Sequence, residues 1–322
     1  MKLKDTYKCK GKENENVLVF NFDLEAVLYT PCDKVSTIFY LRKLCTYNCT
    51  MFDLVSRLGY CYMWNETEGK RGSNEISSCL YRYLSESKAK EVVFFTDTCG
   101  GQNRNQYFST MMMYIVETDI TISSIDHIFM VQGHSHMEVD NMHSAIERKS
   151  NGLQIYDPYG WEVIAAIARK NPYFVNQLRN SDIIDVKALQ KEMHVNNVKM
   201  NMNDEKVQWH NITWMRFEKE NPKTIFYKYS YEGEFMMINT TTGRRSKRNS
   251  EVSTGCSLPK AFTGKLPISK AKKKDLMQLC KDKVIPDRFH PFYDSLFVAG
   301  DAESCDVDIL EGESSDNTDE ES

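Results

Sequence analysis

The sequence predicts a mixed α/β fold, a sheet of parallel and antiparallel strands flanked by helices. Two apolar runs, residues 17–22 and 92–96, are rich in β-branched and aromatic residues and end directly before an aspartate, as buried strands do. Strand-like segments alternate with segments of helical period between residues 17 and 172. With 41% hydrophobic residues among 322, the chain can bury a large core.

The individual elements follow from local pattern and from turn and capping residues. The segment 73–84 has one apolar stripe, and Ser73 or Asn74 is the expected N-cap. Three aromatic and β-branched segments between residues 35 and 64 favour antiparallel strands that turn near residues 57–59. In chain order, the expected elements are strand 17–22, strand-like segments 38–40, 47–55 and 60–64, helix 73–84, strand 92–96, helix 106–117, strand 125–131, helix 137–149 and helix 161–168.

This order is that of a ribonuclease H-like mixed sheet. In that arrangement the first strand is central, and the strand after the first helix lies parallel beside it. The two strand ends would therefore place Asp23 and Asp97 next to each other.

The helix at 137–149 carries two stripes. The apolar stripe repeats at i, i+3 and i+7, and so does a polar stripe on a neighbouring face. The apolar residues are Val139, Met142 and Ile146, and the polar residues are Asp140, His143 and Glu147. The first stripe should hold the helix on the sheet while the second offers a third acid.

The domain organisation expected from composition has four parts. The strands expected near 209–217, 224–231 and 234–238 form a smaller β-rich region, and Ser269 should cap a last helix. Basic clusters lie at 244–248 and 270–274, as solvated faces or as nucleic-acid patches. The four parts are a lead-in without periodicity at 1–16, the core at 17–172, a C-terminal α/β region at 173–298 and a disordered acidic tail at 299–322.

Charge and cysteine usage point to an intracellular protein. The residues from Gly300 onward hold ten Asp/Glu and no Lys/Arg, so 41 basic against 35 acidic residues leave the body at +6. Ten cysteines without a Cys-x-x-Cys pair read as free thiols. No secretory leader or long apolar run is visible, so we expect a nuclear or cytoplasmic protein that is neither secreted nor membrane-spanning.

The carboxylates predict a divalent-cation site. Acids converging from different elements repel one another unless a cation lies between them, and oxygen ligands favour Mg²⁺ or Mn²⁺. We expect Asp23 and Asp97 as catalytic and metal-binding residues, completed by Glu147 or Asp140. Each acid also has an ordinary interpretation: Asp97 as a turn former, Asp140 as a first-turn helix acid and Glu147 as a surface residue.

The glycine turn after Asp97 is a candidate DNA contact, because a helix begins just beyond it and its free amides can bind phosphate. The predicted DNA-binding residues are Gln102, Asn103, Arg104 and Asn105. His134 and His143 could support proton transfer or orient the acids. Glu25, Glu75 and Glu138 have no special placement and are expected in solvent.

Several motifs together resemble a family of uncharacterised, transposon-derived eukaryotic proteins that is similar to DDE-type transposases. The resemblance covers about residues 17–297, and its motifs are at residues 22–31, 72–76, 97–105, 133–147, 285–286 and 290–293. It implies a ribonuclease H-like core that cuts and transfers DNA strands with Mg²⁺ or Mn²⁺. Asp140-Asn141-Met142-His143 matches a short transposase pattern, but Glu147 follows without the usual helical insertion, so either acid could be the third ligand.

Two functions from different classes follow. The first is a metal-dependent DNA nuclease or transposase core, truncated or domesticated, since the N-terminal DNA-binding module of a complete transposase is not seen. The alternative is a catalytically inactive, transposase-derived module that binds DNA or protein. The oligomeric state is left open, with a homo-oligomer as one option.

Overall fold

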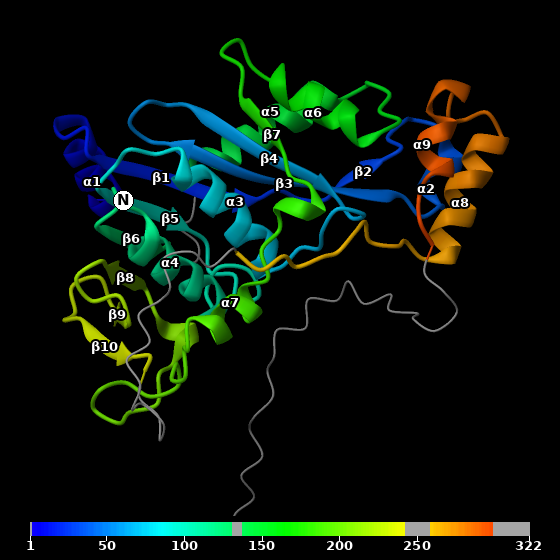
Figure 1. Cartoon of the computed structure of the whole chain (residues 1–322). Coiled ribbons are helices and arrows are strands. Elements are labelled where there is room, and N and C mark those ends of the chain that lie inside the picture. Colours follow the sequence, from blue (N-terminus) through cyan, green and yellow to red (C-terminus); the bar gives the residue numbers. More distant parts are fainter. Residues whose placement is uncertain (1, 131–136, 242–257, 299–322) are drawn as a thin grey trace, which may run out of the picture.

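A ten-stranded mixed sheet forms the centre of the molecule in the computed structural model, which describes residues 2–130, 137–241 and 258–298 (Figure 1). The strand order is β10-β9-β8-β6-β5-β1-β3-β4-β7, and β2 pairs with β3 beside this path. The strands are β1 Val17–Leu24, β2 Leu28–Thr30, β3 Leu44–Asp53, β4 Gly59–Asn65, β5 Glu91–Thr96, β6 Ser124–Phe129, β7 Phe174–Gln177, β8 Trp214–Glu218, β9 Thr224–Lys228 and β10 Met236–Asn239. The predicted mixed α/β fold is confirmed.

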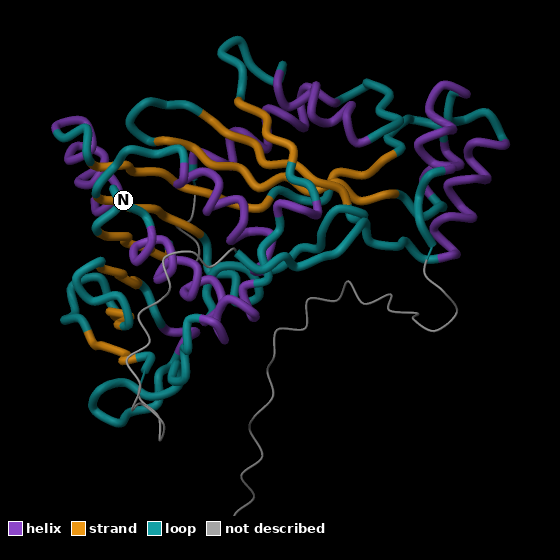
Figure 2. Tube along the Cα trace, in the orientation of Figure 1, coloured by secondary structure: helices purple, strands orange, loops and turns teal. Residues whose placement is uncertain are grey.

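Helices cover both faces of this sheet (Figure 2). The α-helices are α1 Lys2–Glu13, α2 Ser36–Phe39, α3 Ser73–Ser85, α4 Gln106–Thr118, α5 Glu138–Ser150, α6 Pro158–Ala166, α7 Val186–Glu192, α8 Lys270–Lys281 and α9 His290–Asp294. Short 3-10 turns are η1 Asn180–Asp182, η2 Trp209–Asn211 and η3 Asp287–Phe289. Helices α3, α4 and α7 pack together on one side, and α5 lies over β1 and β3 on the other.

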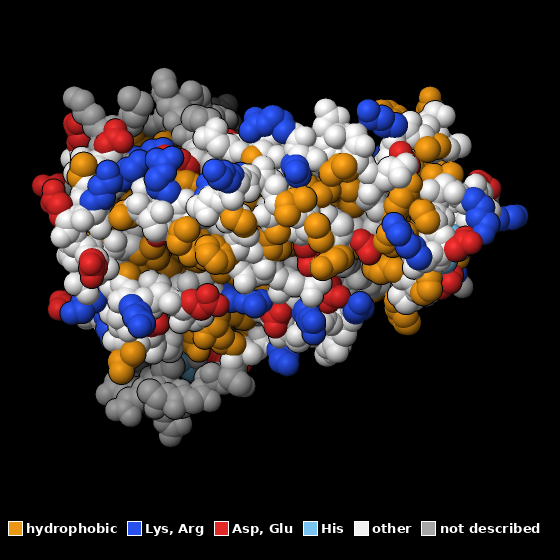
Figure 3. All heavy atoms as spheres, turned by 90° about the horizontal axis from the view of Figure 1, so that it is seen from above, with side chains coloured by type: hydrophobic (Ala, Val, Ile, Leu, Met, Phe, Trp, Pro, Cys, Tyr) orange, Lys and Arg blue, Asp and Glu red, His pale blue; other side chains and the backbone are white. Residues whose placement is uncertain are grey.

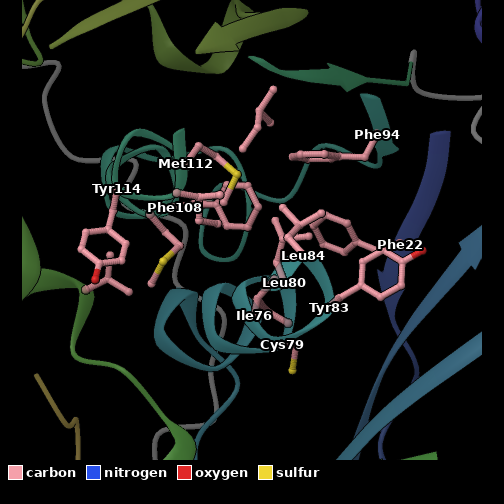
Figure 4. Packing of buried hydrophobic residues seen from close by; sticks show 14 of the residues in the cluster. Phe22, Ile76, Cys79, Leu80, Tyr83, Leu84, Phe94, Phe108, Met112 and Tyr114 are labelled. Carbon is pink, nitrogen blue, oxygen red and sulfur yellow. The ribbon is translucent and has the colours of Figure 1, made fainter. Parts of the chain in front are cut away.

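The central strands are buried on both faces, which explains their nearly continuous apolar sequence. Phe22 of β1 lies 5.6 Å from Phe94 of β5 and 6.0 Å from Phe108 of α4, measured between ring centroids. Figure 4 shows these rings packed against Leu80 and Leu84 of α3. This face of the sheet is apolar, so the strand ends are positioned by a core on the side opposite α5.

The helix patterns are confirmed in two places. Helix α5 buries Val139, Met142 and Ile146, the apolar stripe expected from the sequence. Helix α8 begins after Ser269, whose hydroxyl accepts a hydrogen bond from the Lys272 amide at 3.2 Å. Both helices therefore follow from local pattern alone.

The cap expected for α3 is wrong. Gly72 is the N-cap, and Glu75 at the N3 position accepts the Gly72 amide at 3.0 Å. Asn74 lies inside the helix, where its side-chain Oδ1 accepts a hydrogen bond from the Val186 amide of α7 at 3.0 Å. Asparagine favours cap positions, but here the hydrogen bond to α7 holds Asn74 inside α3.

Residues 1–16 contain more structure than the predicted lead-in. Helix α1 packs on β1, and the Tyr7 ring lies 6.3 Å from Phe95 and 6.1 Å from Trp214. The helix was missed because few of its residues are apolar, and its packing depends on two of them, Leu3 and Tyr7.

The segment 38–40 is also not a strand. Ile38 and Phe39 lie in the short helix α2, and Ile38 is buried in a third core cluster with Leu276 and Tyr293 from α8 and α9. This cluster lies at the end of the molecule beyond β2 (Figure 1).

The strands expected near 209–217, 224–231 and 234–238 correspond to β8, β9 and β10, and they extend the same sheet. Strand β7 was not predicted, and it pairs with β4 in parallel, whereas β8 pairs with β6 in antiparallel register. Asp126 of β6 secures the second junction by accepting hydrogen bonds from Arg216 Nε at 2.8 Å and from Trp214 Nε1 at 2.6 Å. The basic cluster at 244–248 and the acidic tail lie outside the described residues.

A candidate metal site between the sheet and α5

Asp23 and Asp97 lie at neighbouring strand ends. Strands β1 and β5 are parallel, with Asn21 opposite Phe95, so continuing this register by two residues places Asp23 opposite Asp97. Neighbouring strands are about 4.8 Å apart, and residues two apart on a strand share a face. Both aspartates therefore belong to the face of the sheet that α5 covers.

Helix α5 supplies the acids and the imidazole opposite β1. Asn21 donates a hydrogen bond from Nδ2 to Glu138 Oε2 at 2.6 Å, which Lys4 Nζ also contacts at 3.0 Å. One turn further along α5, Asp140 and His143 lie opposite Asp23. Polar residues at alternate positions of β1 thus lie opposite polar residues along one side of α5. We call this contact the polar seam, and it interrupts a face that is otherwise apolar.

Three of these side chains lie close enough to share an ion. One ligand atom each from Asp23, Asp140 and His143 lies within 4.8 Å of the other two. All three side chains are half-buried. Within the described residues this is the single group of three or more His, Cys, Asp or Glu side chains with that proximity, and neither Asp97 nor Glu147 belongs to it.

Thr50 of β3 orients His143. The Thr50 hydroxyl lies 2.6 Å from His143 Nε2 and 3.2 Å from the backbone oxygen of Asp23. When the hydroxyl donates to that carbonyl, Nε2 carries the imidazole proton and donates to Thr50, which leaves Nδ1 as an acceptor. A neutral imidazole with a free nitrogen is a competent metal ligand.

The aspartate ending β1 resists ionisation. Burial, and after it the charges of Asp97 and Asp140, raise the pKa of Asp23 to about 7. A hydrogen bond from the Leu24 amide and the charge of Arg71 act in the opposite direction. Converging carboxylates thus carry an electrostatic cost that a divalent cation would remove.

His143 is shifted towards its neutral form. Burial lowers the pKa of His143 to about 4, although the charge of Asp140 opposes this shift. The imidazole is therefore uncharged at neutral pH, as metal binding requires.

The turn after Asp97 uses its polar side chains to hold its own shape. Asn103 is buried and donates to Asp97 Oδ1 at 3.1 Å, while its Oδ1 accepts the Cys99 amide at 3.2 Å. Asn105 caps α4 by accepting the amides of Tyr107 and Phe108, both at 3.0 Å. Asn103 therefore positions Asp97.

The remaining residues of this turn differ in exposure. Gln102 is buried, whereas Arg104 is half-buried with its guanidinium 4.8 Å from the Phe129 ring centroid and donating to the His210 carbonyl. Arg104 also interacts electrostatically with Asp97. DNA binding by this segment stays a prediction.

Glu147 is exposed on α5 and interacts electrostatically with Glu25. Glu25 is only 1% exposed, so its expected solvation is wrong. Its Oε2 accepts a hydrogen bond from Asn48 at 2.8 Å. Burial raises the pKa of Glu25 to about 8, with further contributions from Glu147 and Asp23.

Glu75 and Glu138 are also not solvated surface residues. Glu75 is 2% exposed and accepts the amides of Lys70 and Gly72, whereas Glu138 is half-buried in the seam. A signal for the seam was present in the sequence, because Asn21 and Asp23 of β1 and Glu25 just after it stand at alternate positions. His134 lies outside the described residues.

Comparison with known proteins gives one match. The family model described as "Domain of unknown function (DUF7869)" matches residues 54–232, which is more than half of the 322-residue chain. No curated protein and no solved structure matches. The matched range contains Asp97, Asp140 and His143 and begins after Asp23. Among the described residues, no helix has the length and hydropathy to cross a membrane.

Proposed function

The chain belongs to the DUF7869 family, and we propose that it is a divalent-cation-dependent enzyme that cleaves or transfers DNA strands. The observation that carries the proposal is the convergence of Asp23, Asp140 and His143, with Asp97 at the neighbouring strand end. Nucleases and polynucleotidyl transferases hold their ions with converging carboxylates of this kind.

The residues fit a cation of the Mg²⁺ or Mn²⁺ type. Asp23, Asp140 and His143 would hold one ion, and Asp97 would extend the site towards a second. Carboxylates suit Mg²⁺ and Mn²⁺, and an imidazole among them favours Mn²⁺ over Mg²⁺. A bound ion would activate a water or hydroxyl and stabilise the leaving oxygen of a phosphodiester.

The chain's own groups would prepare the reaction. Asn103 holds the Asp97 carboxylate in place, and Thr50 orients His143. Arg71 and Arg104 interact electrostatically with Asp23 and Asp97, respectively, and offer positive charge near a phosphate. Asp140 is proposed as the third acid in place of Glu147, because it belongs to the close group.

The topology supports assigning a ribonuclease H-like core. Within the sheet, the order β4-β3-β1-β5-β6 has antiparallel pairs β4-β3 and β3-β1 followed by parallel pairs β1-β5 and β5-β6. Helix α5 then crosses the face over β1 and β3. The DDE-type transposase origin remains part of this proposal.

The test compares Mn²⁺ binding and DNA nicking in matched variants. We expect the purified protein to nick supercoiled plasmid in Mn²⁺, and Asp97→Asn and Asp140→Asn to lose at least two orders of magnitude in rate. Asp53→Asn is the control, because Asp53 also ends a strand but only accepts the Val55 and Ser56 amides, an acceptor role that asparagine keeps. Undiminished nicking by Asp97→Asn would overturn the assignment.

The same variants separate an enzyme from a binding module. If Mn²⁺ gives no thermal stabilisation while DNA binds with a salt-sensitive affinity, the chain is an inactive DNA-binding derivative. Glu147→Gln resolves the third ligand, because it should leave nicking within about threefold whereas Asp140→Asn should not.

A further inference from the structure

An aromatic patch lies around β2 and α2, at the end of the molecule opposite β10 (Figure 1). Hydrophobic side chains lie among charged ones on the surface at this end (Figure 3). We define it as Tyr29, Phe39, Tyr40 and Lys43. Phe39 is 84% exposed and Tyr40 is 88% exposed, while Tyr29 is 48% exposed. The Lys43 ammonium lies 5.8 Å from the ring centroids of both Tyr29 and Phe39.

The patch is held rigidly from beneath. Ile38, between the exposed residues and the core, is 1% exposed and packs in the cluster formed with α8 and α9. The Tyr29 carbonyl accepts a hydrogen bond from Trp161 Nε1 at 3.3 Å. Buried neighbours therefore anchor this segment, while the exposed rings themselves do not contribute to the core.

Exposed aromatic rings beside a cation are the features that bind single-stranded nucleic acid. Every base has a face that can stack on an aromatic ring, and nearby lysines bind the phosphates. The Phe39 and Tyr40 rings are 6.4 Å apart between centroids and inclined by 66°, so each presents a separate surface. The adjacent Arg42 is paired with Asp275 at 2.9 Å, whereas the Lys43 ammonium lies over the Tyr29 and Phe39 rings.

The patch is also within reach of the candidate metal site along the same chain segment. Six residues separate Asp23 from Tyr29, so their Cα atoms are at most about 20 Å apart. At about 3.4 Å per stacked nucleotide, this distance corresponds to about six nucleotides of one strand.

We propose that the aromatic patch binds the bases of single-stranded DNA, with Phe39 and Tyr40 as stacking platforms and Lys43 on the backbone. The choice of DNA rests on the proposed function. The patch would hold the unpaired strand that extends from the cleavage site, so it adds a binding surface that the acids do not provide.

The experiment measures binding without any divalent cation. Fluorescence anisotropy of a labelled oligothymidylate of about 20 nucleotides in EDTA should show the double variant Phe39→Ala/Tyr40→Ala binding at least tenfold more weakly than the natural chain. Stacking is typically worth about 1–3 kcal/mol per base, which is about five- to 150-fold. Tyr40→Phe should keep the affinity, because stacking does not use the hydroxyl.

Controls exclude unfolding and general surface effects. Tyr159→Ala removes another exposed aromatic residue, 65% exposed on α6, and should leave binding unchanged. The double variant should keep the thermal unfolding midpoint, because both truncated rings are mostly in solvent. Lys43→Ala should reduce the slope of log binding constant against log salt concentration by about 0.7 in magnitude.

The outcomes separate this proposal from the proposed function. Two results would overturn the aromatic patch as a DNA site. One is binding by the double variant within twofold of the natural chain, and the other is no binding by the natural chain. The second result would indicate that the patch binds a protein partner instead. DNA binding through the patch without any Mn²⁺-dependent nicking would support the patch and refute the enzyme.

Discussion

Replacing Asp23 with asparagine should stabilise the metal-free protein at alkaline pH. The pKa of Asp23 is about 7 in the folded state, against an ordinary value of 3.8, so the folded carboxyl holds its proton more tightly. Stability from this group is therefore fully present below about pH 4 and is lost as pH rises to about 7. At about 1.4 kcal/mol per pKa unit, the full loss is on the order of 4 kcal/mol.

Asparagine removes this loss while keeping the local hydrogen bond. The Leu24 amide donates to Asp23 Oδ1 at 2.8 Å, and an amide oxygen can accept it equally. Urea denaturation of Asp23→Asn and the natural chain in EDTA should give equal free energies of unfolding at pH 4. The variant should be more stable by a few kcal/mol at pH 8.

Mn²⁺ should make the natural chain more stable relative to Asp23→Asn. At a concentration about a hundred times its dissociation constant, an ion stabilises the native state by about 2.7 kcal/mol. The natural chain should gain this stability and Asp23→Asn should not. Below pH 7 the ion must displace the Asp23 proton, so Mn²⁺ affinity should fall about tenfold per pH unit, with no added contribution from His143 down to about pH 5.

Two results would refute this reasoning. If Asp23→Asn were less stable than the natural chain at pH 8 in EDTA, the carboxylates would not repel one another as described. If Mn²⁺ stabilised the variant and the natural chain equally, the ion would bind elsewhere.

Three further variants test the surrounding structure. Asp126→Ala should cost about 3–5 kcal/mol in urea denaturation, because it leaves Arg216 and Trp214 without their buried acceptor, and a loss below 1 kcal/mol would contradict the role of this ion pair. Asn105→Ala should cost about 1 kcal/mol by removing the α4 cap, whereas Asn105→Ser should recover most of it, as thermal unfolding would show. Glu25→Gln should be near neutral in stability at pH 4 and stabilising at pH 9, since the folded pKa of about 8 exceeds the ordinary 4.5 and stability is lost as pH rises between them; equal effects at both pH values would contradict a buried protonated carboxyl.

Local sequence patterns predicted the strands and the helix that bring the acids to one region. Two apolar runs ending in Asp23 and Asp97 are strong strand signals, because burial on both faces requires apolar side chains throughout. The two stripes of α5 were likewise readable, since a helix projects residues three and four apart onto one face. Mixed α/β architecture followed from the order of these elements.

Which of these side chains lie close together depends on how the elements pack, and the sequence pattern does not predict it. Asp140 rather than Glu147 joins Asp23 in the close group, because the crossing of α5 over β1 sets which turn of the helix faces the strand end. Glu25 is buried and accepts a hydrogen bond from Asn48 of β3, although a glutamate after a strand is usually solvated. The exposure of Phe39 and Tyr40 depends on Ile38 packing against helices more than 200 residues away in the chain, and no local pattern encodes a contact of that separation.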